Sequence, residues 1–427
     1  MKYVIIGGSA AGVGAAEAIR KKDKKSFIKL ISDEKLPLYS RCLLTYYMAG
    51  MIDETKLYFK PRDFYKKKNI DSYLGKKALS IDRAKKKVLL DGRKTIDYDK
   101  LLIATGASPK TVDVPGADKK GIFTVRNIED ARAIIALLKK TEDIVVLGGG
   151  LIGLRDAYAL RQRGKRVTVV VKSLQVLSQM LDKDAADIIE NLFRKKGINI
   201  MTGVAATKIT GKESVEEVEL DNGEKIACQL LVIGKGVTPN TELASLCGLK
   251  IIDGIEVDEY LRTSDKDIFA AGDVTETYDI AREDKRINAL WPCAVEQGEI
   301  AGANMTGEKK IYEGSLSMNS VDFFGVASIS MGITKPKKNI YESISRKEGN
   351  NYKKLVFKNN TIVGMVLVGE IGSSGVISTL IKNKIDISGI KDILLEDNFD
   401  YGKIMPLVKK YQDKFNKEEY RDTVITY

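Results

Sequence analysis

Short apolar runs that lead into glycine-rich turns and then into helical periodicity are the clearest pattern in the chain. The stretch YVIIGGSAAGVGAAEAIR, which starts at Tyr3, has an apolar β-rich run, a glycine turn and apolar residues at helical spacing. The stretch DIVVLGGGLIGLRDAYALR, which starts at Asp143, repeats this order. The pattern therefore predicts the same unit of strand, glycine loop and helix twice.

Both glycine loops have the spacing of a dinucleotide-binding turn. The three small residues are Gly7, Ser9 and Gly12 in the first loop and Gly148, Gly150 and Gly153 in the second. The first allows a tight turn, the middle one lets the backbone approach a pyrophosphate, and the third lets helix and strand pack closely. The helix that follows offers free N–H groups and a positive end to the phosphates. Two such loops predict two dinucleotide sites.

The residues that close the second strand of each unit are expected to contact the adenosine ribose. In the first unit FIKLISDE ends on Asp33 and Glu34, and the Glu34 carboxylate can accept hydrogen bonds from ribose hydroxyls. In the second unit RVTVVVKS ends on Val171, Lys172 and Ser173, with no acid. A cation and a hydroxyl tolerate a 2′-phosphate, so the sequence leaves the choice between NADH and NADPH open.

Other segments between and after these units end strands or begin a helix. YDKLLIATGASP ends on Ala104, Thr105 and Gly106, LVIGKGVTPNTELA places Gly236 in a turn-rich exit, and SDKDIFAAGDV runs into Gly272 and Asp273. TVDVPGADKKG, around Pro115, is typical of a connection between domains. WPCAVEQGEIAGANM has apolar residues at helical spacing after Pro292, which predicts a helix.

The composition is that of an ordinary globular protein. The chain has 427 residues, of which 44% are hydrophobic and 30% charged, and this length fits roughly three domains. No apolar run approaches the ~18 residues of a membrane span, and MKYVIIGG is too briefly apolar for a signal peptide. We therefore expect a cytoplasmic protein with no membrane contact.

The absence of histidine and the placement of cysteine restrict the chemistry. The sequence has no histidine, which removes Ser–His and Cys–His nucleophile mechanisms and histidine-ligated metals. The cysteines Cys42, Cys228, Cys247 and Cys293 are scattered and form no CxxC or CxxxxC pair, so we expect no metal site and no disulfide framework. Hydride transfer between bound cofactors suits these limits, because the cofactors supply the chemistry.

The net charge is +12, and the lysines occur in short, dispersed groups. Aromatic residues are not interleaved with them and no nucleic-acid module is present, so we expect no nucleic-acid binding. A lysine-rich solvated surface and the steering of an acidic protein partner or anionic cofactors both remain open.

The order of these motifs resembles the flavoproteins with two dinucleotide-binding domains, the pyridine nucleotide–disulfide oxidoreductase superfamily. The resemblance rests on the first glycine loop with Glu34, ATG at 104–106, the second glycine loop and AAGD ending at Asp273, and it covers roughly residues 1–310. It implies an α/β fold with two Rossmann-like, glutathione-reductase-like domains, which bind FAD first and NAD(P)H second. A small α+β domain follows at the C-terminus.

The resemblance also implies roles for individual residues. For FAD these are Gly7, Ser9, Ala10, Gly12, Glu34, Arg41, Ala104, Thr105, Gly106, Gly272, Asp273 and Gln297, with Glu296 as a candidate catalytic residue near the flavin pyrimidine edge. For NAD(P)H they are Gly148, Gly150, Ile152, Gly153, Lys172 and Gly236. A helix N-terminus near Ala294 would stabilise the negative charge that appears when flavin accepts a hydride.

Within the superfamily, YSRCLLTYYMAG, LWPCAVEQG and the C-terminal pattern are most similar to NADH:rubredoxin reductases and to the flavin region of assimilatory nitrite reductases. The tail predicts a strand, a turn at Asn359 and Asn360, a strand and a helix. The sequence lacks cysteines for a sirohaem and iron–sulfur centre, so nitrite reduction by this chain alone is not expected. Relatives commonly have a glutamate, the partner of a lysine beneath the nicotinamide, where this chain has Arg155 followed by Asp156.

Cys42 separates two kinds of enzyme. NADH oxidases, NADH peroxidases and coenzyme A-disulfide reductases carry a single redox cysteine in a segment of this shape, and Cys42 falls at the matching place. A thiol at a helix N-terminus beside Arg41 should have a lowered pKa. A small buried residue that only packs fits the position as well, so a redox thiol and a packing residue both stay open.

These observations predict a domain order and a reaction. We expect an FAD domain at 1–112 and 250–312, an NAD(P)H domain at 113–249 and an α+β domain at 313–427, in a monomer or homodimer. The predicted reaction passes electrons from NAD(P)H through FAD to a small, acidic electron-carrier protein such as rubredoxin. The alternatives are an oxidase or a CoA-disulfide or persulfide reductase that uses Cys42, and an electron-transfer subunit of a larger nitrite-reductase-like complex.

Overall fold

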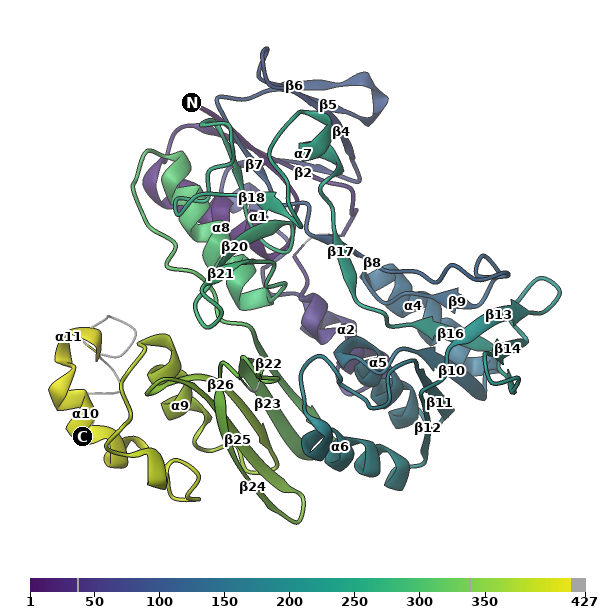
Figure 1. The fold of residues 1–427 in the computed structure, drawn as a ribbon. Coiled ribbons are helices and arrows are strands. Elements are labelled where there is room, and N and C mark those ends of the chain that lie inside the picture. Colours follow the sequence, from purple (N-terminus) through teal and green to yellow (C-terminus); the bar gives the residue numbers. More distant parts are fainter. Residues whose placement is uncertain (37, 338, 416–427) are drawn as a thin grey trace. The chain divides into compact units, whose positions relative to one another are not determined.

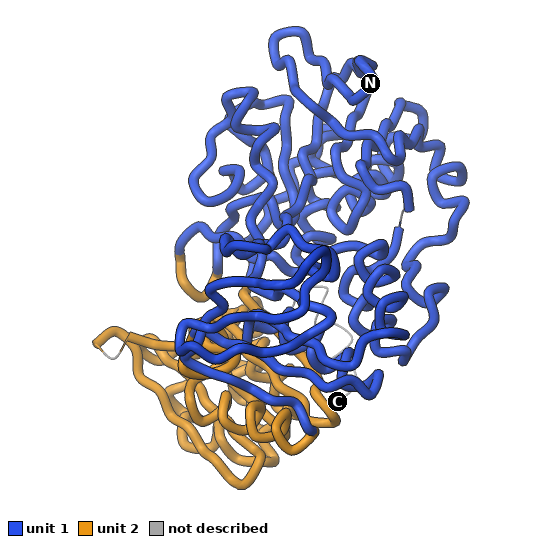
Figure 2. Tube along the Cα trace, turned by 90° about the vertical axis from the view of Figure 1, so that its right-hand side faces the viewer, with its two compact units in different colours: residues 1–172, 197–279, 284–315 blue, residues 173–196, 280–283, 316–427 orange. Residues whose placement is uncertain are grey.

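The fold was analysed in a computed structural model, which describes residues 1–36, 38–337 and 339–415. The rest of the predicted C-terminal domain, residues 416–427, lies outside the described residues. The chain forms two compact units, coloured separately in Figure 2. Unit 1 comprises residues 1–172, 197–279 and 284–315, and unit 2 comprises residues 173–196, 280–283 and 316–427. The predicted boundaries at 112, 249 and 312 do not coincide with this division, and the assignment of separate FAD and NAD(P)H domains stays a prediction.

Unit 1 contains two five-stranded parallel sheets, each built around one of the predicted glycine loops (Figure 1). The first has the order β19-β7-β1-β2-β3, with β1 Lys2–Ile6, β2 Phe27–Ser32, β3 Ile70–Leu74, β7 Lys100–Ile103 and β19 Ile268–Ala270. The second has the order β12-β11-β10-β16-β9, with β9 Ile122–Phe123, β10 Asp143–Leu147, β11 Arg166–Val171, β12 Ile198–Thr202 and β16 Leu230–Ile233. Each sheet has its own apolar core, as expected for strands that are buried on both faces.

The helices of unit 1 begin where the glycine loops predict them. Helix α1 spans Ala10–Lys22 after the first loop, and α5 spans Leu151–Gln162 after the second. The other helices are α2 Leu44–Ala49, α3 Phe64–Lys67, α4 Ile128–Leu137, α7 Glu242–Leu246 and α8 Trp291–Met305. Short 3₁₀ helices lie at Arg41–Leu43, Glu54–Leu57, Asp91–Arg93 and Leu138–Lys140.

Smaller sheets complete unit 1. They are β4 Ala78–Asp82 with β5 Lys87–Leu90 and β6 Thr95–Asp97; β13 Ala206–Thr210 with β14 Glu217–Leu220 and β15 Lys225–Ala227; and β18 Ile255–Glu256 with β20 Thr275–Asp279 and β21 Asp284–Arg286. Strands β8 Ala107–Pro109 and β17 Val237–Pro239 pair antiparallel and join the ends of β7 and β16. Asn240 reinforces this pair, since its side-chain amide donates to the carbonyl of Thr105 at 2.9 Å.

Unit 2 is an antiparallel sheet with helices packed on it. Its order is β22-β23-β26-β25-β24, with β22 Met318–Phe323, β23 Val326–Gly332, β24 Glu342–Glu348, β25 Asn351–Lys358 and β26 Thr361–Val368. The helices are α6 Lys183–Lys195, α9 Ser374–Lys382, α10 Tyr401–Lys410 and α11 Gln412–Phe415, with a 3₁₀ turn at Lys391–Ile393. The predicted strand, turn at Asn359 and Asn360, strand and helix is confirmed by β25, β26 and α9.

The two sheets of unit 1 repeat the same backbone geometry at their glycine loops. The Gly7 N–H donates to the carbonyl of Ile31 at 2.8 Å, and the Gly148 N–H donates to that of Val170 at 2.9 Å. On the other side, Ala104 N–H bonds to Ile6 O and Gly234 N–H bonds to Leu147 O. The strand pairings around the two loops are therefore equivalent, and each residue next to the first loop has a counterpart next to the second.

Candidate functional site

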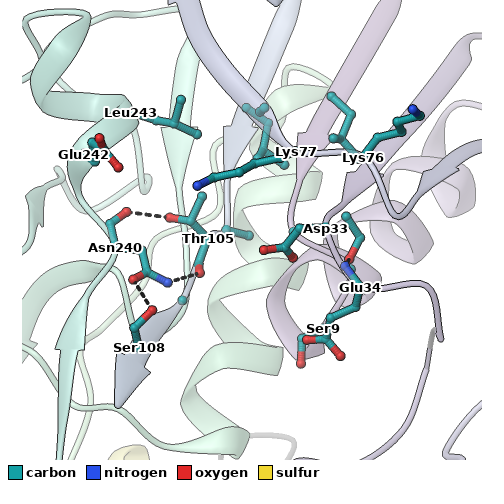
Figure 3. A pocket seen from close by; sticks show the side chains of 18 of the residues that line it. Ser9, Asp33, Glu34, Lys76, Lys77, Thr105, Ser108, Asn240, Glu242 and Leu243 are labelled. Atoms are coloured by element: carbon teal, nitrogen blue, oxygen red, sulfur yellow. Dashed lines mark hydrogen bonds between the residues drawn. The ribbon is translucent and has the colours of Figure 1, made fainter. Parts of the chain in front are cut away.

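A cavity of about 730 Å³ lies beside the first glycine loop, within unit 1. Figure 3 shows its walls, with Ser9, Asp33 and Glu34 from the ends of β1 and β2, and Thr105, Ser108 and Asn240 from the β8 and β17 region. The residues expected from the sequence that line it are Gly7, Ser9, Glu34, Arg41, Ala104, Thr105 and Gly106. The carboxyl ends of three neighbouring parallel strands thus bring these residues to one place.

The first loop leaves no room for side chains at Gly7 and Gly12. A Cβ atom at Gly7, which has φ +123°, would lie 2.0 Å from the carbonyl O of Ala104. A Cβ atom at Gly12 would lie 1.9 Å from the carbonyl O of Gly7, so the strand and the helix touch there. Ala10 is the first residue of α1 and is buried. Backbone N–H groups at the start of α1 can therefore approach a pyrophosphate closely, and the cavity fits a dinucleotide.

The second loop has the same close contacts and an open middle position. A Cβ atom at Gly148 would lie 2.4 Å from Gly234 O, and one at Gly153 would lie 2.0 Å from Gly148 O. At Gly150 a Cβ atom would have nothing within 4 Å, so this position faces open space. Ile152 is partly exposed at the start of α5. This arrangement fits a second pyrophosphate.

Glu34 is held at the cavity wall by two side chains. Tyr39 donates its hydroxyl hydrogen to Glu34 Oε2 at 2.6 Å, and the Arg41 guanidinium bonds to Glu34 Oε1. Arg41 also donates to the carbonyl O of Arg126 at 2.8 Å. The Glu34 carboxylate is thereby fixed at the wall of the cavity, and Arg41 is oriented by partners on both sides.

Arg126 also lines the cavity, and the sequence reasoning missed it. Its guanidinium lies 3.7 Å from the Asp273 carboxylate. Desolvation, with the nearby charge of Arg41, lowers the pKa of Arg126 from its usual value, whereas Asp273 acts in the opposite direction. The only local signal is its position just before Asn127, the N-cap of α4. Arg126 therefore links the cavity to the Gly272–Asp273 turn.

Gln297 is engaged within the protein rather than directed at the cavity. It is 2% exposed, and its Oε1 accepts hydrogen bonds from Gly272 N–H at 2.8 Å and from the Thr275 hydroxyl at 2.9 Å. Its amide donates to the hydroxyl of Tyr312 at 3.2 Å. These contacts fix the turn that presents Asp273. Glu296, the preceding residue, is exposed on α8.

The cations near the second loop are Lys172, which follows β11, and Lys235, which follows β16. Both are exposed. Gly236 comes next, with φ +85° at the turn into β17. Desolvation lowers the pKa of Lys235, and the charge of Lys172 lowers it further, so the two ammonium groups are near enough to repel.

The expectation of a lowered pKa at Cys42 is wrong. Desolvation raises the pKa of the Cys42 thiol above its usual value, and Arg155 and a hydrogen bond with Ser40 only partly offset this. Arg41 does not serve as its cation, because Arg41 is bound to Glu34 and to the Arg126 carbonyl. Cys42 also lies in the three-residue 3₁₀ turn before α2, rather than at the N-terminus of a long helix. The thiol is nevertheless exposed, and Asp273 is close enough to raise its pKa.

Arg155 and Asp156 face different surroundings. Arg155 donates to the carbonyl O of Cys42 at 2.6 Å, and its guanidinium lies 5.5 Å from the ring centroid of Tyr46. Asp156 is fully buried, and within the described residues neither carboxylate oxygen has a hydrogen-bond partner. Asp156 therefore does not replace the glutamate that relatives have at position 155. Instead, Arg155 makes a cation–π contact and a backbone hydrogen bond there.

The described part of the chain has neither a cluster of metal-ligating residues nor a helix that could span a membrane. Over 1–36, 38–337 and 339–415, no group of three or more cysteine or acidic residues is placed to hold a metal ion. In the same ranges, no helix combines the length and the apolar character needed to cross a bilayer.

Comparison with known protein families gives two matches. Residues 1–298 match the model of the pyridine nucleotide-disulphide oxidoreductases. The chain belongs to this family. Residues 318–385 match the rubredoxin NAD+ reductase C-terminal domain. The chain is therefore an FAD-dependent NAD(P)H oxidoreductase, and the recognition made from its motifs and the α/β fold class are confirmed.

Individual members of the pyridine nucleotide-disulphide oxidoreductase family differ in their activities. An NADH oxidase of Methanocaldococcus jannaschii is 38% identical over 73% of this chain and 72% of its own length. A rubredoxin-NAD(+) reductase of Pseudomonas putida is 34% identical over 64% of this chain and 71% of its own. The assimilatory nitrate reductase electron transfer subunit of Bacillus subtilis is 29% identical over 92% of this chain, which spans only 51% of that relative.

A solved structure supports the same family. The NAD-dependent persulfide reductase from A. fulgidus superposes with a TM-score of 0.86 at 33% identity, over 90% of this chain and 77% of that protein. These relatives include carrier-protein reductases and enzymes that reduce other acceptors, so the family alone does not choose the acceptor.

Proposed function

We propose that the protein passes electrons from NAD(P)H through FAD to a small electron-carrier protein such as rubredoxin. The observation that carries this proposal is the setting of Cys42, because the neighbouring Arg41 guanidinium is bound to Glu34 and to the Arg126 carbonyl rather than to the thiol. Desolvation also raises the pKa of this thiol. A protonated thiol is a weak nucleophile and a weak redox centre. The flavin is then the centre that transfers electrons to the acceptor. The match of residues 318–385 to the rubredoxin NAD+ reductase C-terminal domain supports the same acceptor class.

The first site would hold FAD through its glycine loop and its charged wall. The start of α1 would bind the pyrophosphate through N–H groups, and Glu34 would accept hydrogen bonds from the ribose hydroxyls. Arg41 keeps Glu34 in place, and Arg126 offers a guanidinium to the cofactor's anionic or carbonyl oxygens. Gln297 would act as a positioning residue, because it holds the turn that presents Asp273.

The cofactors would supply hydride transfer, and the chain's own residues bind and orient them. The second loop would bind the NAD(P)H pyrophosphate at the N-terminus of α5. The space beside Gly150 is open and would admit it. Helix α8 would direct its N-terminus, which begins at Trp291, toward the flavin. Whether Glu296 takes part in catalysis stays a prediction.

A second candidate acts through Cys42 on a disulfide, a persulfide, a peroxide or oxygen. It is favoured by the exposure of Cys42 and by the guanidinium of Arg155, which lowers the pKa of this thiol. A third role, as an electron-transfer subunit, is favoured by the likeness to a Bacillus subtilis subunit about twice as long.

The acceptor can be tested by steady-state turnover of the flavin-loaded protein in wild type and Cys42→Ser. The carrier proposal predicts that both forms reduce rubredoxin with NAD(P)H at similar rates. Cys228→Ser, which changes a buried cysteine, controls for the effect of losing a thiol. If the Cys42 variant alone loses activity toward a persulfide or CoA disulfide, and neither form reduces rubredoxin, the second candidate replaces the first.

A further inference from the structure

The internal repeat in unit 1 relates residues of the first cavity to residues near the second loop. Ile6 pairs with Ile31 and Ile103, and Leu147 pairs with Val170 and Ile233. Counting onward from these registers, Asp33 corresponds to Lys172 and Thr105 corresponds to Lys235. The same hydrogen bonds close both loops, so the correspondence holds in the backbone and not only along the sequence.

The two positions in the first half both belong to the cavity. Asp33 and Thr105 line it, and both are labelled in Figure 3. By the repeat, Lys172 and Lys235 occupy the corresponding walls of the second dinucleotide site. An acid and a hydroxyl in the first site are thus replaced by two cations in the second.

The glycine contacts place the residue before Lys172 and the backbone of Lys235 against the second loop. A Cβ atom at Gly149 would lie 2.7 Å from the side chain of Val171, the residue before Lys172. A Cβ atom at Gly148 would lie 3.5 Å from the backbone nitrogen of Lys235. The loop is therefore flanked by Lys172 on one side and Lys235 on the other.

Neither ammonium group is neutralised within the described part of the chain. No ion pair or side-chain hydrogen bond joins Lys172 or Lys235 to another described residue, whereas Lys165 and Arg166, near the other end of β11, pair with Glu142 and Asp143. Desolvation lowers the pKa of Lys235, and the charge of Lys172 lowers it further, so the two like charges lie near each other. Two like charges beside one loop are stabilised by a bound anion.

We infer that Lys172 and Lys235 together bind the 2′-phosphate of NADPH, and that NADPH rather than NADH is the preferred donor. This inference rests on the proposed function, because it takes the second loop as the donor site. The pyrophosphate already has the N-terminus of α5, so two further cations beside the ribose position suit an additional phosphate. By the same register Glu34, the expected ribose acid of the first site, corresponds to Ser173, so the second site has no carboxylate there to bind a free 2′-hydroxyl and repel the phosphate.

The inference is tested by binding, without turnover, using the flavin-loaded protein. Isothermal titration calorimetry compares NADP+ with NAD+, two nucleotides that share the pyrophosphate and differ only in the 2′-phosphate. Wild type should bind NADP+ at least about tenfold more tightly, the size expected for one added charge-assisted contact. Lys172→Ala and Lys235→Ala should each remove most of this preference, and Lys172→Asp should reverse it.

Lys139→Ala is the matched control, because this exposed lysine lies in the turn before β10, at the opposite end of the sheet from the loop. It should leave both affinities unchanged. Equal binding of the two nucleotides by wild type would overturn the inference while leaving the donor site intact. Equal weakening of both nucleotides by the lysine variants would also overturn it, since the lysines would then bind the pyrophosphate. Binding of neither nucleotide would reject the donor site itself, and with it the proposed function.

Discussion

At the scale of single residues, the charged wall of the first cavity depends on Arg41, which is bound both to Glu34 and to the backbone of Arg126. Glu34 could be predicted because a carboxylate at the end of a second strand has a fixed relation to the glycine loop. Arg126 could not, because it lies in a connection 85 residues from Arg41 and reaches the cavity only through folding. The pKa of Cys42 was mispredicted for a related reason. Sequence adjacency suggested Arg41 as its cation, but Glu34 takes that guanidinium.

Asp156 is a residue whose effect on stability follows from burial. Desolvation raises the pKa of its carboxyl to about 8, with Arg155 acting in the opposite direction. Because the folded-state pKa is above the unfolded one, the folded protein holds this proton more tightly than the unfolded chain does. Its contribution to stability is therefore greatest below pH 4 and is lost as the pH rises from about 4 to about 8.

We expect Asp156→Asn to remove this loss, which amounts to about 1.4 kcal/mol per pH unit within that interval. Urea unfolding at pH 5.5 and pH 8 measures it, and the variant should exceed wild type by more at pH 8. Asp113→Asn, which changes an exposed carboxylate, should give no such difference. A wild type and an Asp156→Asn variant with the same pH dependence would show that Asp156 is not buried as a neutral acid.

Helices and loops show how glycine spacing shapes the elements around the site. The two glycine loops were predictable, since their turn chemistry is local, and both were followed by helices as expected. The packing of α8 on α1 was not predicted, although the glycines that permit it are in the sequence. Figure 1 shows the two helices side by side, and a Cβ atom at Gly298 would lie 2.1 Å from the carbonyl O of Ala11.

Gly298→Ala should therefore push α8 away from α1. Because the clash is with backbone, we expect a loss of about 1–3 kcal/mol in the free energy of unfolding, together with weaker retention of FAD. Thermal unfolding and the flavin content after gel filtration measure both effects. Gly375→Ala is the control, because a Cβ atom there meets nothing within 4 Å and alanine favours a helix. A Gly298 variant as stable as wild type would refute the close packing.

The sequence could not assign α6 to unit 2, because that depends on contacts between distant residues. Residues 173–196 lie inside the predicted NAD(P)H domain along the chain but belong to unit 2. Asp182, the N-cap of α6, accepts hydrogen bonds from the Tyr352 hydroxyl at 2.7 Å and from the Lys354 ammonium at 2.7 Å. Both partners are on β25, about 170 residues later in the sequence. No local sequence pattern near Asp182 predicts these two contacts.

At the scale of the whole molecule, the feature that bears on encounters with charged partners is the net charge of +12. If the acceptor is an acidic carrier, long-range attraction speeds the encounter and is screened by salt. We expect kcat/KM for rubredoxin to fall by about tenfold or more as the ionic strength rises from 0.02 M to 0.5 M. A small uncharged quinone, whose encounter with the protein does not depend on charge, gives the comparison rate. A carrier rate that does not change with salt would argue against an electrostatically steered partner.

The central claim is that flavin is the only redox centre of the chain, and an anaerobic reductive titration tests it most directly. Wild type and Cys42→Ser, both loaded with FAD, are titrated with dithionite while the electrons taken up per flavin are counted. The account predicts uptake near two electrons in both proteins. FAD accepts two electrons, and the Cys42 thiol accepts none because it is already reduced. Extra uptake in wild type that is absent from Cys42→Ser would contradict it and make Cys42 a second redox centre.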